Sequence, residues 1–156
     1  MKKLDNFVNC LEVLKKADFS LAENDDIYRT GIIGQYNLTF ELSWKALQEV
    51  LRQHGVMEAQ TGSPREILQL GYKVGFVNDS EVWLTMLKKR NESVHIYDED
   101  KIDELILLIK DSFIPAFMAL AETLKEKLNT AKTLGAHRAV GLWQELGGFL
   151  SGKQLS

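Results

Sequence analysis

The stretch DEDKIDELILLIKDSFIPAFMALAETL, residues 98–124, carries the clearest periodic pattern of apolar residues in the sequence. Its apolar residues recur every three or four positions, which places them on one face of an amphipathic α-helix. They are Ile102, Leu105, Ile106, Ile109, Phe113, Phe117, Leu120 and Leu124. Asp98 is a favourable N-cap for this helix. Pro115 lacks a backbone N–H donor, so we expect the helix to kink or loosen one turn upstream, near Asp111.

Working outward, the N-terminal third of the chain predicts two more helices. An apolar stripe from Leu4 indicates a first helix that ends before the polar segment at residues 22–26. Asp25 and Asp26 supply an N-cap and a first-turn acid for a second helix that ends at Gly55 and is about 40 Å long. Its apolar residues are Ile33, Leu38, Phe40, Trp44, Leu47 and Leu51, and its internal glycines, Gly31 and Gly34, indicate either a close helix contact or a bend.

Two shorter helices follow. Ser63–Glu66 has the sequence of a capping box, with serine at the N-cap, proline next and glutamate at the third helical position, and this helix should stop near Gly75. The polar residues 78–81 then signal a fourth helix that runs towards Lys88, Lys89 and Arg90. The whole pattern predicts an all-α fold, an antiparallel, up-and-down bundle of about five helices without strands.

One domain is expected from the length of 156 residues, since a chain of this size buries about two-thirds of its unfolded surface. We assign residues 1–128 to the bundle and residues 129–156 to a C-terminal extension. Glycines interrupt short apolar clusters in the extension, which leaves open a short helix, a mobile tail or a segment that folds on a partner.

Composition excludes several classes of protein. The 19 basic and 22 acidic residues give a net charge of -3, which argues against a protein that coats nucleic acid by bulk electrostatics but allows a local basic patch. Cys10 is the single cysteine, and the three histidines are scattered, so we expect no disulfide and no metal site. The N-terminus does not read as a secretory signal, so we expect none, and the sequence has no apolar run that could span a bilayer and no glycine-rich phosphate loop. We expect a cytoplasmic protein without a cofactor.

The segment RNESVHIY, Arg90–Tyr97, gathers reactive side chains between the fourth helix and the fifth. Histidine titrates near cellular pH, and the guanidinium of arginine suits a phosphate group. Cleavage of RNA without a metal needs a base, an acid and a cation for the charge on phosphorus. On a continuous helix, Arg90 and His95 would point about 140° apart. They converge only if the backbone loosens, and Asn91, Ser93 and Val94 favour such a loosening.

One arginine and one histidine cannot fill every role in such a reaction. A two-fold dimer would bring two copies of the segment to one cleft, so the pattern suggests a homodimer with a composite site. The alternative interpretation is structural, because cations in the last turn of a helix stabilise its negative end. From the residues alone, both interpretations stay open.

The segment resembles the R-x4-H-x-Y motif of the HEPN superfamily, specifically the HepT-like toxins and the nucleotidyltransferase substrate-binding proteins. Further resemblance lies in FELSWK (Phe40–Lys45), in SPRE (Ser63–Glu66) and in the tryptophan helix VWLTMLKKRN that leads into the motif. Together these segments span roughly residues 3–124.

This resemblance implies a dimerising helical bundle that works with a separately encoded minimal nucleotidyltransferase (MNT). It further implies a metal-independent endoribonuclease in which Arg90 binds the scissile phosphate and His95 is the general acid or base. The partner would silence this site by attaching AMP to Tyr97, because the nucleotide would place bulk and negative charge where the RNA phosphate must sit.

Four residues complete the predicted site as substrate-binding groups. Lys89 and Asn91 flank Arg90, while Glu41 and Lys45 belong to FELSWK. The i, i+4 spacing of Glu41 and Lys45 equally predicts an ordinary ion pair on a helix surface, which we favour. Trp44 between them is expected to pack in the core.

Three function classes therefore stay open. The chain is a toxin-like ribonuclease controlled by nucleotidylation, a non-catalytic subunit that presents a substrate or its own tyrosine to the nucleotidyltransferase, or a helical scaffold with a vestigial motif.

Overall fold

The structure is a computed structural model that describes residues 2–93 and 98–130. In this part of the chain the fold is all-α, without strands, as predicted. The elements are α1 (Lys2–Lys15), α2 (Phe19–Ala22), α3 (Asp26–Gln53), the 3₁₀ turn η1 (Met57–Gln60), α4 (Pro64–Lys73), α5 (Ser80–Ser93) and α6 (Glu99–Leu108). A π-helical turn, Ile109–Phe113, continues α6 into a helix over residues 114–130.

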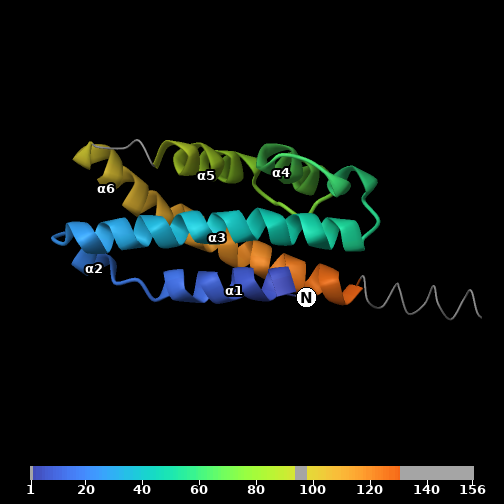
Figure 1. Cartoon of the computed structure of the whole chain (residues 1–156), viewed down its shortest axis with the longest axis horizontal. Coiled ribbons are helices and arrows are strands. Elements are labelled where there is room, and N and C mark those ends of the chain that lie inside the picture. Colours follow the sequence, from blue (N-terminus) through green and yellow to red (C-terminus); the bar gives the residue numbers. More distant parts are fainter. Residues whose placement is uncertain (1, 94–97, 131–156) are drawn as a thin grey trace, which may run out of the picture.

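The long helix α3 is the centre of the bundle. It runs the length of the molecule with α1 along one side and α4 and α5 along the other, while the chain from α6 to residue 130 crosses behind it (Figure 1). The predicted bundle is confirmed, and the structure adds the short elements α2 and η1, which the apolar pattern does not predict.

Several predicted helix ends are confirmed in detail. Asp25 caps α3 by accepting the backbone N–H of Tyr28. Ser63 and Glu66 form the capping box at the start of α4. Gly55 and Gly75 follow α3 and α4 with φ of 76° and 87°, a left-handed backbone that glycine adopts without strain.

Pro115 has the predicted effect on the last long helix. The π-helical turn Ile109–Phe113 contains Asp111, whose carbonyl lies four residues before the proline nitrogen that cannot donate to it. A π-helical turn widens the helix by one residue, which accommodates the missing hydrogen bond. The loosening thus occurs where the sequence indicates, and the helix continues beyond it.

An aromatic cluster fills the middle of the core. Tyr36 stacks on Phe113 with 5.4 Å between ring centroids, and Phe117 meets Phe7 and Trp83 edge to face. All of these side chains are buried. The cluster joins α1, α3, α5 and the last helix, so it fixes the position of α5 against α3.

Two expectations for α3 need correction. Leu38 is predicted on the apolar face, but half of its surface is exposed, because the side of α3 that carries Ile32, Tyr36 and Phe40 faces the core. A close packing contact at Gly31 or Gly34 is wrong for the described part of the chain, since a Cβ added at either position would meet nothing within 4 Å.

None of the helices described here is long and apolar enough to cross a membrane.

Candidate functional site

Arg90 lies near the end of α5, where packing of the helix fixes its direction. Asp79 accepts the backbone N–H of Val82 and starts the helix. Trp83 and Met86 are buried against the core, and Arg90 follows Met86 by four residues, on the same side of the helix. The guanidinium therefore emerges beside α3, with 36% of the side chain exposed.

Glu41 of α3 forms an ion pair with the guanidinium of Arg90. Its Oε2 accepts a hydrogen bond from an N–H of the Arg90 guanidinium at 2.9 Å and another from the indole of Trp44 at 3.1 Å. Its Oε1 lies 3.3 Å from the ammonium of Lys45, so the ion pair predicted from the i, i+4 spacing is confirmed. The carboxylate thus joins two cations, and this group of side chains keeps a net charge of +1.

Trp44 is half-buried and packs against the core, as predicted for it, while its N–H faces Glu41.

Polar contacts continue along α5 beyond Arg90. The second terminal nitrogen of the guanidinium donates to the side-chain oxygen of Asn91 at 3.2 Å. Asn37 of α3 donates to the hydroxyl of Ser93 at 3.0 Å, and this hydroxyl donates to the carbonyl of Arg90 at 2.8 Å. The last turn of α5 is therefore tied to α3 on both sides of Asn91.

These contacts show where the expected loosening of the helix does not occur. Asn91 and Ser93 are helical, so α5 keeps its form up to Ser93, and the loosening predicted between Arg90 and His95 does not occur at these two residues. Val94, the third residue expected to favour it, lies outside the described residues. Asn37 stabilises this last turn from outside the helix. His95 and Tyr97, the other two residues of the motif, lie outside the described residues.

Lys89 faces a different neighbour. Its ammonium lies 3.6 Å from Glu104 of α6, while Lys88 is exposed. The structure therefore brings together Arg90, Asn91, Glu41 and Lys45, and it directs Lys89 away from them.

Sequence reasoning missed the contribution of Tyr36. This residue is fully buried, and its hydroxyl donates to the carbonyl of Met86 at 2.5 Å, one turn before Arg90. Burial raises the pKa of the Tyr36 phenol well above its ordinary value, and the nearby charge of Arg90 opposes this only in part. In the sequence, Tyr36 reads as one more apolar position of α3.

His54 has a structural environment, as expected for a residue at a helix end. It is the C-cap of α3, and its ring nitrogen lies 2.6 Å from the carbonyl of Lys127. The described residues contain no cluster of histidine, cysteine or carboxylate groups that could hold a metal ion.

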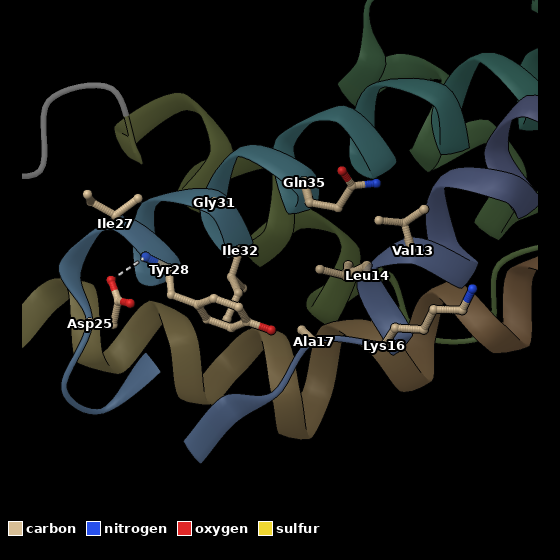
Figure 2. Close-up of a pocket in the computed structure, with 10 residues that line it drawn as sticks. All are labelled: Val13, Leu14, Lys16, Ala17, Asp25, Ile27, Tyr28, Gly31, Ile32 and Gln35. Atoms are coloured by element: carbon tan, nitrogen blue, oxygen red, sulfur yellow. Dashed lines mark hydrogen bonds between the residues drawn. The ribbon is translucent and has the colours of Figure 1, made fainter. Parts of the chain in front are cut away.

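A pocket of about 470 Å³ lies elsewhere, between the end of α1 and the first half of α3 (Figure 2). Its walls are mainly apolar, and the ring of Tyr28 extends across it towards Ala17. The polar groups at its rim are Lys16, Asp25 and Gln35. None of the described residues predicted for the RNA site lines this pocket.

The fold and this group of side chains define a class of protein: an all-α bundle whose central helix anchors an arginine at the end of a neighbouring helix. The chain belongs to the family of nucleotidyltransferase substrate binding protein-like proteins, whose family model matches residues 2–126. The predicted family is thereby confirmed, and its description links the chain to a nucleotidyltransferase.

Two further similarities agree with this family. A protein of Haemophilus influenzae named probable ribonuclease HepT is 26% identical over 99 residues, which cover 62% of this chain and 68% of that protein. The crystal structure of a protein from Thermus thermophilus superposes with a TM-score of 0.62 at 26% identity, covering 80% of this chain and 98% of the other. The chain is thus a distant relative of a HepT protein.

Proposed function

We propose that the chain is the HEPN-type partner subunit of a minimal nucleotidyltransferase. We further propose that it is a metal-independent endoribonuclease, which the partner silences by transferring AMP to Tyr97. The observation that carries this proposal is the partly exposed guanidinium of Arg90, which Glu41 and Asn91 hold at the start of the R-x4-H-x-Y motif. The similarity to a protein named probable ribonuclease HepT supports it.

The proposed chemistry divides the roles among the residues of this site. Arg90 binds the scissile phosphate and stabilises the negative charge that develops on its oxygens. His95 is the general acid or base, which takes a proton from the 2′-hydroxyl or gives one to the leaving oxygen. Lys45 and Lys88 add positive charge for the RNA backbone. Tyr97 accepts AMP, whose phosphate would repel the RNA phosphate from the same place.

The working form is a homodimer, because one histidine cannot serve as base and acid at once. We place the dimer contact on the exposed side of α3, where Ile27 is 85% and Leu38 50% exposed. Asn37 and Glu41 of the same helix touch the last turn of α5, so this contact would set two motif segments beside each other.

Cleavage of RNA in the presence of EDTA tests the catalytic part of the proposal. The purified chain should cleave single-stranded RNA when every free divalent metal is chelated, because the mechanism uses only side chains. The His95→Ala chain should lose this activity, and an equal rate from that variant would contradict the role of His95.

The alternative is a non-catalytic subunit that presents a substrate or its own tyrosine to the nucleotidyltransferase, which the family description favours. Both functions share Tyr97 as the acceptor of AMP. Incubation with the nucleotidyltransferase and ATP should increase the intact mass by one AMP for each chain modified. No increase for the natural chain, or the same increase for Tyr97→Phe, would exclude this acceptor role.

A further inference from the structure

Glu41 has an unusual position for a residue at an RNA site. A carboxylate repels phosphate, yet its Oε2 lies 2.9 Å from the guanidinium that is proposed to bind the scissile phosphate. A carboxylate that touched the substrate directly would weaken binding at this place. Glu41 must therefore act through Arg90 if it takes part in the reaction at all.

The contacts of Glu41 suit it for holding another side chain. Trp44 and Lys45 fix the carboxylate on α3, from one turn of the same helix. Arg90 approaches from α5, 49 residues later in the chain, and Glu41 is the one group on another helix that hydrogen-bonds its guanidinium within the described part of the chain. The pair is half-buried, with 29% of the glutamate side chain and 36% of the arginine side chain exposed, and its hydrogen bond is charge-assisted.

The remaining donors of Arg90 then have a defined direction. A guanidinium carries five N–H groups, and the contacts with Glu41 and Asn91 use two of them, one on each terminal nitrogen. The other three make no hydrogen bond within the described part of the chain. A planar fork that is held by part of its donors can present the rest to a phosphate without losing further rotamer freedom.

We propose that Glu41 is a positioning residue that holds Arg90 in the orientation for the scissile phosphate. This inference rests on the proposed ribonuclease function. It revises the interpretation of Glu41 as a substrate-binding group, because the carboxylate contacts the arginine and would repel an RNA phosphate. The cost of this arrangement is a weaker attraction for RNA, since the carboxylate removes one unit of positive charge from the site.

The Glu41→Gln variant separates the positioning of Arg90 from the effect of the negative charge on RNA binding. Glutamine has the same shape and still accepts from Trp44, but it neither carries charge nor holds the guanidinium as strongly. We expect kcat for RNA cleavage in EDTA to fall about tenfold or more, since a misplaced group costs on the order of 10- to 100-fold. We expect KM to fall as well, by about fivefold, because a repulsive charge is removed.

Glu104→Gln is the matched control. Glu104 pairs with Lys89, also on α5, at 3.6 Å, so this variant makes the same change in net charge without touching Arg90. Its kcat should stay within about twofold of the natural value. Circular dichroism of all three chains checks that each is folded. A purely structural role of Glu41 would not lower kcat and KM together.

A second measurement makes the inference independent of turnover. Binding of an RNA oligonucleotide with 2′-deoxy substitution at the cleaved positions, followed by fluorescence anisotropy, should be about fivefold tighter for Glu41→Gln. An active natural chain together with unchanged kcat and KM for Glu41→Gln would overturn the inference and leave the ribonuclease function standing. If the natural chain does not cleave RNA, the ribonuclease function is wrong, and with it the positioning role in that reaction. In that case, equal binding of the oligonucleotide by Glu41→Gln and by the natural chain would also show that Glu41 does not lie beside a phosphate site.

Discussion

Tyr36 shows how the core supports the candidate site at the level of one residue. Its ring stacks on Phe113, and its hydroxyl donates to the carbonyl of Met86 in α5. Because the phenol is buried, its pKa is raised well above the ordinary value of about 10. The folded state therefore strongly favours the neutral phenol, while the unfolded chain can ionise it.

Alkaline pH should reveal this difference in stability. A raised pKa in the folded state means that the stability is fully present below about pH 10 and is lost as pH rises further, by about 1.4 kcal/mol per unit. The Tyr36→Phe chain should lack this part of the loss, while it should be about 1 kcal/mol less stable at pH 7 for want of the hydrogen bond. Urea unfolding between about pH 9 and 11.5, on either side of the ordinary phenol pKa, measures both effects.

The exposed Tyr72 provides the control for this experiment. Tyr72→Phe removes an exposed phenol and leaves the buried one in place, so it should keep the alkaline slope of the natural chain. An identical slope for Tyr36→Phe and the natural chain would contradict the assignment.

The two ion pairs of Glu41 differ in how far the sequence predicts them. The pair Glu41 and Lys45 follows from helical spacing, which depends only on local geometry. The pair Glu41 and Arg90 joins residues 49 positions apart, and it depends on how α5 packs against α3. Nothing in a local pattern specifies that contact, so the sequence predicts Glu41 as a site residue without its partner.

At the scale of elements, predictions succeeded where one strong local signal decides. The capping box at Ser63 and the effect of Pro115 on the last helix follow from single backbone groups, and both are confirmed. The apolar pattern does not predict the four-residue elements α2 and η1, because such short turns contain no full period of apolar residues. Asp18 caps α2 locally, while Gln48 and Arg52 of α3 hold η1 through the carbonyl of Ala59.

The last turn of α5 differs from the local expectation at Asn91 and Ser93 for a related reason. Asn91 and Ser93 have modest helix propensity, which favours a break if the segment is considered alone. In the structure, the hydroxyl of Ser93 donates to the carbonyl of Arg90 and accepts a hydrogen bond from Asn37 of α3. This contact between two helices stabilises the last turn. The orientation of Arg90 is therefore a property of two helices together.

At the scale of the whole molecule, the proposed dimer makes a distinct prediction. Leu38→Glu places a charge on the exposed side of α3, where it should prevent the contact without disturbing the core. Light scattering during gel filtration should give the mass of a dimer for the natural chain and of a monomer for this variant. Cleavage of RNA should be lost with the dimer, since the site is composite.

Met57→Glu is the control for this variant, because Met57 is exposed on η1 at the other end of α3. This chain should remain dimeric and active. A dimer that survives Leu38→Glu would place the contact on another surface, and an active monomer would contradict the composite site.

The rate constant of RNA cleavage in EDTA, measured with enzyme in excess over substrate, tests the ribonuclease assignment most directly. We expect a measurable rate for the natural chain and a rate at least about 100-fold lower for Arg90→Ala, because removal of one group that stabilises charge in the transition state costs on the order of 10²–10³. Equal rates for the two chains would contradict the role of Arg90 and, with it, the ribonuclease site proposed for the segment Arg90–Tyr97.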